Sequence, residues 1–225
     1  LSMAVIVADH RSGEILASAG TRAFAARAGG FVDMTVARRS PGSTLKPLVY
    51  ALAWDRGIAH PETLIADTPA RFGTYAPQNF DGRFRGEVAT AEALRLSLNV
   101  PVVRLTDAVG PAVLWSALRR SGADPALPGG VPGLALSLGG VGMTLQELVQ
   151  MYAALARGGA AVPLRWQGAA GDPVRVVSPV AAWQVGDALA RLMPPPGHGR
   201  PGAVAWKTGT SYGHRDAWAI GWNGR

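Results

Sequence analysis

The sequence predicts an α/β protein of the α+β kind, in which an antiparallel sheet built from both ends of the chain is flanked by helices and carries an inserted helical lobe. Two observations support this fold class. Apolar, strand-like runs occur at residues 3–9 and 14–19, and again at 203–207 and 217–222. Between these runs, proline, glycine and capping residues delimit a series of helical patterns.

The length fits one domain. A chain of 225 residues can bury a sizeable core of its own, and no linker marks a second domain. We therefore predict a single domain over residues 1–225, with a sheet lobe of about 1–50 and 160–225 and a helical lobe of about 51–159. The chain opens Leu1-Ser2 without an initiator methionine, and we expect it to be part of a longer protein.

Turn residues organise the first half of the chain. The stretch His10–Gly13 separates the first two apolar runs and predicts a hairpin turn. Pro41-Gly42 predicts a turn before a helix that runs from Ser43 to about Arg56. Residues 57–84 are rich in proline and glycine and are expected to be loop. Further helices are expected at about 90–96, 101–108 and 111–121.

Capping signals organise the second half. The residues Thr144–Glu147 form a capping box at the start of a helix, and Gly158-Gly159 mark its end. Ser178-Pro179 predict another helix, with serine as N-cap and proline as first helical residue. Residues 194–201 form a breaker-rich loop before the two final strands.

Composition excludes several kinds of site. The chain has no cysteine, so it forms no disulfide and no thiolate metal site. No metal-ligand spacing of His, Asp or Glu is visible, and we expect no metal and no cofactor. No stretch approaches the roughly 20 apolar residues that span a bilayer. The net charge of +7 comes from scattered arginines, which predicts a solvated basic surface without a nucleic-acid site; contact with anionic cell-wall or lipid polymers stays open.

Lysine usage is the most informative feature of the composition. Of 22 cationic side chains, only Lys46 and Lys207 are lysine, and the others are arginine. Arginine does not act as a proton acceptor in proteins, whereas a desolvated lysine near another cation loses its proton and serves as a base. The two lysines are therefore candidates for chemistry.

Both lysines belong to short motifs that occur in order along the chain. The first is Ser43-Thr44-Leu45-Lys46, which places Ser43 and Lys46 three residues apart at a helix N-terminus, on one face. A serine hydroxyl becomes a nucleophile when a neighbouring base takes its proton. Free N–H groups at the helix start favour an oxyanion there.

Two further motifs complete the set. In Ser97-Leu98-Asn99 the hydroxyl can relay a proton and the carboxamide can bind a peptide bond. In the segment Lys207–Ser211 the lysine would lower the pKa of Lys46, and Gly209 would leave room for a substrate against the strand. The hydroxyls of Thr208 and Thr210 suit a carboxylate. Each motif alone is a weak signal, but the three together in this order are a strong one.

The surrounding residues resemble the transpeptidase domain of class A penicillin-binding proteins, most closely the 1C type. Residues 39–50 resemble the active-site helix of that family, and residues 75–81, 93–94 and 97–101 resemble the 1C type. Residues 138–140, 151–154 and 216–218 fit as well, so the resemblance covers nearly the whole chain. It implies the fold shared by penicillin-binding protein transpeptidases and serine β-lactamases. The family sheet has one more strand after the last run of this chain, so we expect that edge strand to be missing here.

The resemblance also implies the roles of the motif residues in a serine D,D-transpeptidase. Ser43 would be acylated by the penultimate D-alanine of a stem peptide, with Lys46 as base and Ser97 as proton shuttle to the leaving amine. Lys207 would tune the site, and the amine of a second stem peptide would accept the acyl group. β-Lactams would acylate the same serine. The donor peptide would be held by Asn99, Thr208, Gly209 and Thr210, and the oxyanion by the backbone N–H groups of Ser43 and Thr210.

Partners and location follow from the same resemblance. We expect peptidoglycan stem peptides and β-lactam antibiotics as ligands, and no nucleic acid. The family acts in the periplasm or at the extracytoplasmic face of the bacterial inner membrane. Its members carry a glycosyltransferase domain and a membrane anchor, both absent from these 225 residues.

Three related functions remain as alternatives. A D,D-carboxypeptidase, which passes the acyl group to water, shares the first half of the reaction, and a β-lactam-sensing module keeps the same serine. A serine β-lactamase needs a base that activates water, and the only glutamate between the second and third motifs is Glu147, which has a capping role. A Ser-His-Asp hydrolase lacks its serine elbow. The histidines lie in loop-like settings, and only His214 is a candidate for lining the cleft; they are His10, His60, His198 and His214.

Overall fold

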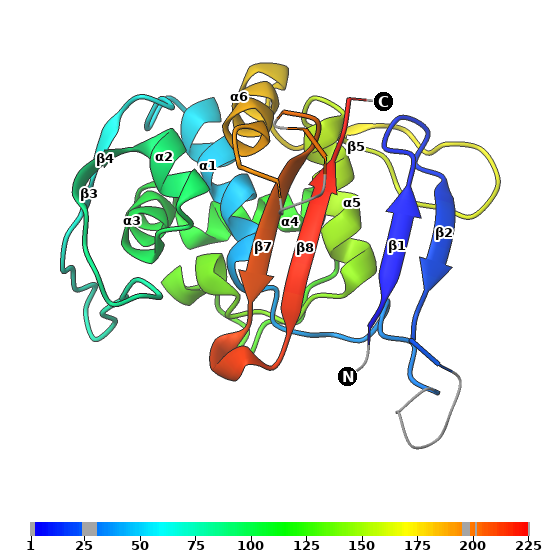
Figure 1. Cartoon of the computed structure of the whole chain (residues 1–225), viewed down its shortest axis with the longest axis horizontal. Coiled ribbons are helices and arrows are strands. Elements are labelled where there is room, and N and C mark those ends of the chain that lie inside the picture. Colours follow the sequence, from blue (N-terminus) through cyan, green and yellow to red (C-terminus); the bar gives the residue numbers. More distant parts are fainter. Residues whose placement is uncertain (1–2, 24–30, 195–198, 201, 225) are drawn as a thin grey trace.

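The computed structural model describes residues 3–23, 31–194, 199–200 and 202–224. Helices occupy its middle and pairs of antiparallel strands lie around them (Figure 1). The strands are β1 (Val5–Ala8), β2 (Ile15–Ala19), β3 (Leu64–Asp67), β4 (Gly86–Ala89), β5 (Ala160–Ala161), β6 (Val174–Arg175), β7 (Ala205–Thr210) and β8 (Ala217–Trp222). The α-helices are α1 (Lys46–Asp55), α2 (Thr90–Arg95), α3 (Asn99–Val109), α4 (Pro111–Arg120), α5 (Leu145–Ala156) and α6 (Pro179–Ala190). Three 3-10 helices are named η2 (Gly42–Leu45), η3 (Leu134–Leu138) and η4 (Tyr212–His214).

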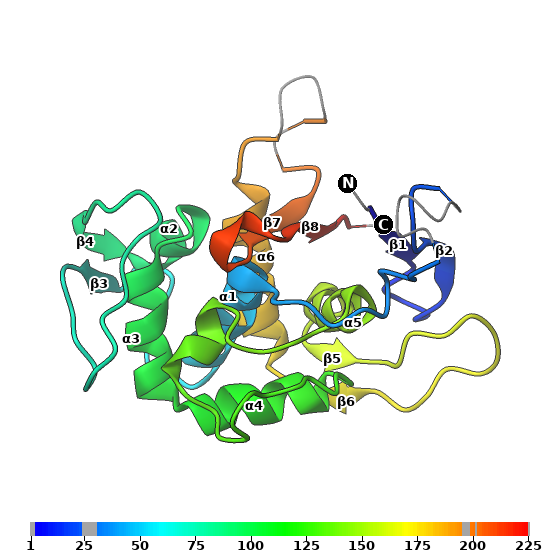
Figure 2. The ribbon, with the colours of Figure 1, turned by 90° about the horizontal axis from the view of Figure 1, so that it is seen from below.

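Helix α1 is the centre of the core. Its sequence is apolar on every side, which is typical of a helix that other elements surround. All of its residues except Asp55 are buried, and it packs against α3 and α6. Figures 1 and 2 show it in the middle of the molecule from two directions. Because α1 begins at Lys46, the core holds one end of the first motif in place.

Strands from both ends of the chain lie side by side, as the sequence predicts, and both pairs are antiparallel. The predicted hairpin of β1 and β2 is confirmed, with Val5 opposite Ala19. The pair β7–β8 runs from Ala205 opposite Trp222 to Thr210 opposite Ala217. Within the described residues, however, the two pairs form separate sheets and not one continuous sheet.

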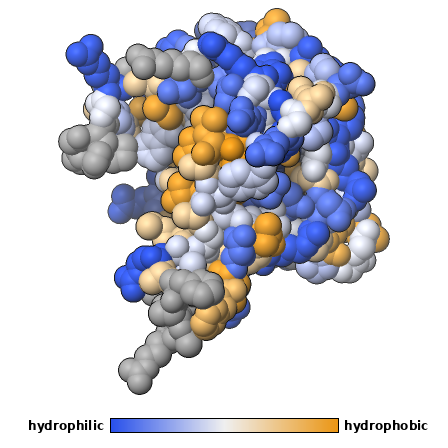
Figure 3. All heavy atoms as spheres, turned by 90° about the vertical axis from the view of Figure 1, so that its right-hand side faces the viewer, coloured by the Kyte–Doolittle hydropathy of each residue, from blue (hydrophilic) through white to orange (hydrophobic). Residues whose placement is uncertain are grey.

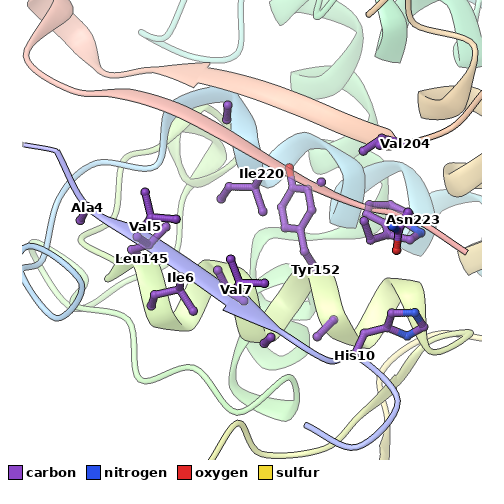
Figure 4. A pocket seen from close by; sticks show the side chains of 16 residues that line it. Ala4, Val5, Ile6, Val7, His10, Leu145, Tyr152, Val204, Ile220 and Asn223 are labelled. Carbon is purple, nitrogen blue, oxygen red and sulfur yellow. The ribbon is translucent and has the colours of Figure 1, made fainter. Parts of the chain in front are cut away.

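A groove of about 440 Å³ separates β1 from β8. Its walls come from these two strands and its floor from α5, including Leu145 and Val149. Figure 4 shows Tyr152 of α5 between the two strands, near Ile220 of β8. Helix α5 packs against both strands, and no described strand lies between β1 and β8, so each pair forms its own two-stranded sheet.

The helix boundaries follow the capping residues. The capping box is confirmed: Glu147 N donates to Thr144 Oγ1 at 3.1 Å, and Thr144 N donates to Glu147 Oε2 at 2.8 Å. Ser178 caps α6, with Pro179 as first helical residue, as predicted. The helix expected from 101 begins earlier, at Asn99, and the helix expected from Ser43 begins with the tighter turn η2 before α1 takes over at Lys46.

The loop predicted over residues 57–84 contains a strand. Leu64–Asp67 forms β3, which pairs with β4 through Leu64 opposite Ala89 and Asp67 opposite Gly86. β3 has only four residues and lies among prolines, so its sequence shows no clear alternation of apolar and polar residues. The strand is identified by its pairing with β4 and not by its own sequence pattern.

The face formed by β1 and β2 is mixed in polarity. Figure 3 views the molecule from this side and shows hydrophobic patches among hydrophilic residues. The exposed apolar side chains of the two strands are Val5, Val7 and Leu16. None of the described helices has the length and apolar character needed to cross a membrane.

Candidate active site

Ser43 lies in η2, directly before the buried helix α1. The turn is held from both sides. Pro41 O accepts hydrogen bonds from the backbone N of Thr44 at 3.2 Å and from its Oγ1 at 2.8 Å, and Tyr152 Oη donates to Thr44 O at 2.9 Å. Ser43 itself is half-buried, and its hydroxyl makes no hydrogen bond to any described residue. The turn is therefore fixed while the hydroxyl stays available to the cleft.

Two glycines let the nucleophile turn pack closely against β7. Gly42 has φ +54°, and a Cβ there would lie 2.3 Å from Thr210 O. A Cβ on Gly209 would lie 2.6 Å from Pro41 O and 2.9 Å from Thr44 N. The side of Gly209 that lacks a side chain thus faces η2. This glycine therefore brings strand and turn together, and it also lines the cleft.

The side chain of Lys46 joins the first motif to the second. Lys46 is fully buried, and its Nζ donates to Leu98 O at 3.0 Å and to Asn99 Oδ1 at 2.7 Å. It also donates to Ser97 O, and the Ser97 Oγ lies 3.4 Å away. The structure therefore brings Ser97 and Asn99 to Lys46, as the sequence analysis expected of an active site.

Both lysines have lowered pKa values. Burial, and after it the charge on Lys207, lowers the pKa of Lys46 well below its ordinary value. Burial lowers the pKa of Lys207 to about 8. Lys207 is 3% exposed and its Nζ donates to Thr208 O at 2.8 Å. A lysine that gives up its proton readily and lies one helical turn from a serine is suited to act as a base.

The loop between α2 and α3 carries the second motif in a strained conformation. Ser97 has φ +57°, which is uncommon for a residue with a side chain and is typical of functional sites. Asn99 follows as the first residue of α3. Its Nδ2 donates to Gln78 O at 2.7 Å, so its carboxamide is held between that carbonyl and Lys46.

The third motif forms β7, with its side chains alternating across the strand. Lys207 is buried, whereas Thr208 and Thr210 are exposed toward the cleft. Trp206 lies on the face opposite Lys207, as strand alternation predicts. The backbone N of Thr210 would lie 3.0 Å from a Cβ on Gly42, so this N–H is close to the nucleophile turn.

One cleft of about 860 Å³ is lined by residues of all three motifs. Phe80 and His214 meet across it: their ring centres are 5.5 Å apart, edge to face, and Phe80 is 81% exposed. His214, the candidate histidine, thus lines the cleft. The lining residues are Ser43, Tyr75, Gln78, Phe80, Leu96, Ser97, Asn99, Leu138, Thr208, Gly209, Thr210, Ser211, Gly213 and His214.

Several of these residues escaped the sequence analysis as site residues. Tyr75, Gln78 and Phe80 come from the segment 75–81, which entered only as part of a resemblance. The sequence feature that could have identified them is a run with two aromatic residues and a proline, whose apolar residues follow neither a helical nor a strand period. Glu147 lies at the start of α5 as predicted, in the capping box and not in the cleft. Among the described residues no three His, Asp or Glu side chains gather as a metal site would require.

Comparison with known proteins places these features in a family. Residues 3–223 match the family model described as the penicillin binding protein transpeptidase domain. The chain is 43% identical over 232 residues to penicillin-binding protein 1C of Escherichia coli (strain K12), and 32% identical over 256 residues to penicillin-binding protein 1B of Vibrio cholerae. Each alignment covers 100% of this chain but only 30% and 32% of the relative, so the chain spans about a third of their length.

A solved structure shows the same fold. The penicillin-binding protein PonA1 from Mycobacterium tuberculosis, solved in complex with penicillin V, superposes with a TM-score of 0.80 at 23% sequence identity. The match covers 99% of this chain and 66% of that chain. The mixed α/β arrangement described above is therefore the fold of a penicillin-binding protein transpeptidase domain.

Proposed function

This chain belongs to the penicillin-binding protein transpeptidase family, and we propose that it is a peptidoglycan D,D-transpeptidase whose nucleophile is Ser43. The observation that carries the proposal is the convergence on Lys46: a buried lysine of lowered pKa follows Ser43 by one helical turn and is bound to Ser97 and Asn99. Such an arrangement supplies a nucleophile, a base and a second hydroxyl for proton transfer in one cleft.

In the acylation half, the Ser43 Oγ attacks the carbonyl carbon of the penultimate D-alanine and Lys46 takes its proton. The tetrahedral oxyanion binds to the backbone N–H groups of Ser43 and Thr210, and Gly42, which has no side chain, lets Thr210 pack closely against the turn that carries Ser43. The C–N bond then breaks. The terminal D-alanine leaves with a proton that Ser97 passes to its amine, and an ester on Ser43 remains.

In the second half, an amine of another stem peptide attacks this ester. The new amide bond forms the cross-link, and the Ser43 oxygen leaves and regains its proton. Asn99 and the exposed hydroxyls of Thr208 and Thr210 hold the donor peptide and its terminal carboxylate, since all three lie along the cleft. A β-lactam acylates Ser43 in the same way. The proposed site of action is the extracytoplasmic face of the inner membrane.

Intact-protein mass spectrometry after incubation with a penicillin tests this proposal. We expect a stable adduct of one penicillin on the parent chain, and no adduct on the Ser43→Ala variant. Absence of an adduct from a folded parent chain would refute the proposal. A parent chain that forms the adduct, and that in a separate incubation without penicillin releases D-alanine from a pentapeptide without cross-linking it to a second peptide, would instead be a D,D-carboxypeptidase.

A further inference from the structure

The side chain of Asn79 links two parts of the molecule that lie outside the three motifs. Its Nδ2 donates to both carboxylate oxygens of Asp67, at 2.8 and 2.9 Å, and to Arg83 O at 2.8 Å. Its Oδ1 accepts a hydrogen bond of 2.7 Å from the backbone N of Asn99. Asn79 is 6% exposed and Asp67 is fully buried. Both the Nδ2 and the Oδ1 of Asn79 therefore make hydrogen bonds within the protein.

Asp67 determines which way the amide of Asn79 points. An ionised carboxylate only accepts hydrogen bonds, so it requires the Nδ2 end of Asn79 and leaves the Oδ1 end to face Asn99. Asp67 is itself fixed, because it ends β3 and accepts a further bond of 2.9 Å from the backbone N of Arg85. A buried carboxylate is costly unless it is hydrogen-bonded, so this arrangement is held firmly.

The side-chain amide of Asn79 supplies a hydrogen-bond acceptor at the start of helix α3, where the N-cap residue provides none. The first N–H groups of a helix have no partner within the helix, and the N-cap residue Leu98 provides no side-chain cap. Asn79 Oδ1 accepts the N–H of Asn99 in its place, and the preceding carbonyl, Gln78 O, accepts from Asn99 Nδ2 at 2.7 Å. Two consecutive residues therefore anchor Asn99, whose remaining side-chain polar atom, Oδ1, faces Lys46 at 2.7 Å.

We propose that Asn79, oriented by Asp67, is a positioning residue that fixes the start of α3 so that Ser97 and Asn99 meet Lys46. Asn79 does not line the cleft and touches no reacting atom. Its effect reaches the reaction through Asn99 and the strained backbone of Ser97, which a loosened α3 would no longer hold. The inference rests on the proposed function, because it concerns the acylation of Ser43.

The test compares the acylation of Ser43 by a penicillin in the parent chain and in the Asn79→Ala variant. We expect the second-order rate constant to fall by about 10- to 100-fold, the size of effect that a small misplacement of catalytic groups produces. We also expect its rise with pH to shift to higher pH, because water entering around Lys46 lets its pKa return toward the ordinary value. A variant that is only less folded shows a smaller reactive fraction with an unshifted pH profile.

Matched carboxylate variants separate this role from a general effect of charge. Asp67→Asn replaces one of the two acceptor oxygens by an amide donor, so the side chain at 67 no longer requires the Nδ2 end of Asn79. Asp81→Asn makes the same change in an exposed residue of the same loop, which binds Arg85 at the surface. We expect slow acylation from the first and the parent rate from the second. Asn79→Asp should be the most damaging single change, since it faces one carboxylate with another. The double variant Asn79→Asp/Asp67→Asn reverses donor and acceptor and should recover part of the rate.

Hydrogen exchange at the Asn99 amide gives a readout that is independent of the reaction. We expect this amide to exchange faster in Asn79→Ala and at the parent rate in Asp81→Asn. Unchanged exchange, or a parent-like rate and pH profile in Asn79→Ala, would overturn the positioning role. A parent chain that forms no penicillin adduct but shows the faster exchange in the variant would refute the proposed function alone and leave the anchoring of α3 standing.

Discussion

The Nζ of Lys46 lies 2.7 Å from the Oδ1 of Asn99, although 53 residues separate them along the chain. This hydrogen bond joins the start of α1 to the start of α3 inside the core. Together with the carbonyls of Ser97 and Leu98 and the Ser97 Oγ at 3.4 Å, it gives the buried amine four oxygen acceptors. These acceptors stabilise the ammonium form, whereas burial and the charge on Lys207 lower the pKa of Lys46. The balance between them governs how readily Lys46 takes a proton from Ser43.

Replacing Lys46 by arginine tests whether a proton acceptor is needed. Arginine keeps the positive charge but does not lose its proton at any relevant pH. We expect Lys46→Arg and Lys46→Met to slow penicillin acylation of Ser43 by roughly 10²- to 10⁴-fold, the range usual for loss of a general base. Stopped-flow or mass-spectrometric rates measure this, with near-ultraviolet circular dichroism as the check on folding. Parent-like acylation by Lys46→Arg would show that Lys46 acts only through its charge.

The lowered pKa of Lys207 predicts how stability changes with pH. Its pKa of about 8 in the folded chain is below the ordinary value of 10.5, so between these values the unfolded chain binds more protons. The penalty for burying its charge is therefore complete below about pH 8 and disappears toward pH 10.5. We expect Lys207→Met to have the higher free energy of unfolding at pH 7, by about 2–3 kcal/mol. Urea denaturation should show this difference shrinking from pH 8 to 10.5, and a constant difference would contradict the prediction.

A methyl group at Gly42 should separate the nucleophile turn from β7. Gly42→Ala combines a left-handed backbone with a Cβ placed 2.3 Å from Thr210 O. Gly57→Ala is a matched control, because Gly57 has φ +66° and nothing lies within 4 Å of a Cβ there. The control should cost about 1–2 kcal/mol for backbone strain alone, with normal acylation. Gly42→Ala should cost more than the control in urea denaturation and should lose the penicillin adduct; equal effects would mean that the contact with Thr210 is unimportant.

Two buried tyrosines offer a comparison of used and unused hydroxyl groups. Tyr152 donates to Thr44 O, whereas the Tyr50 hydroxyl finds no partner among the described residues. Removing the donor in Tyr152→Phe leaves a buried carbonyl with one bond fewer, which should cost about 1–2 kcal/mol and slow acylation because Thr44 follows Ser43. Tyr50→Phe removes an unsatisfied buried oxygen and should be neutral or stabilising. Thermal denaturation of both variants measures the difference, and the opposite order would refute the assignment.

Much of this protein can be predicted from local sequence. The capping residues Thr144 and Ser178 give two helix starts correctly, because a cap involves neighbours within one turn. The choice of lysine at only two positions points to chemistry, since the distinction between lysine and arginine is a property of the side chain itself. Both lysines have lowered pKa values in the folded chain. Local rules thus identify the helix starts and the chemical groups.

The tertiary structure decides how these parts meet. Asp67 carries no signal in a stretch that reads as loop, and Asn79 enters only as part of the resemblance of residues 75–81; the importance of both comes from hydrogen bonds that cross 12 and 20 residues. The role of Gly209 likewise depends on a turn that approaches from elsewhere in the chain. Strand pairing is also decided by the tertiary structure, because β1 and β8 each read as a strand, yet they do not pair with each other within the described residues. Sequence determines the chemical groups and the local turns, whereas close packing between distant segments determines their distances, their burial and therefore their pKa values.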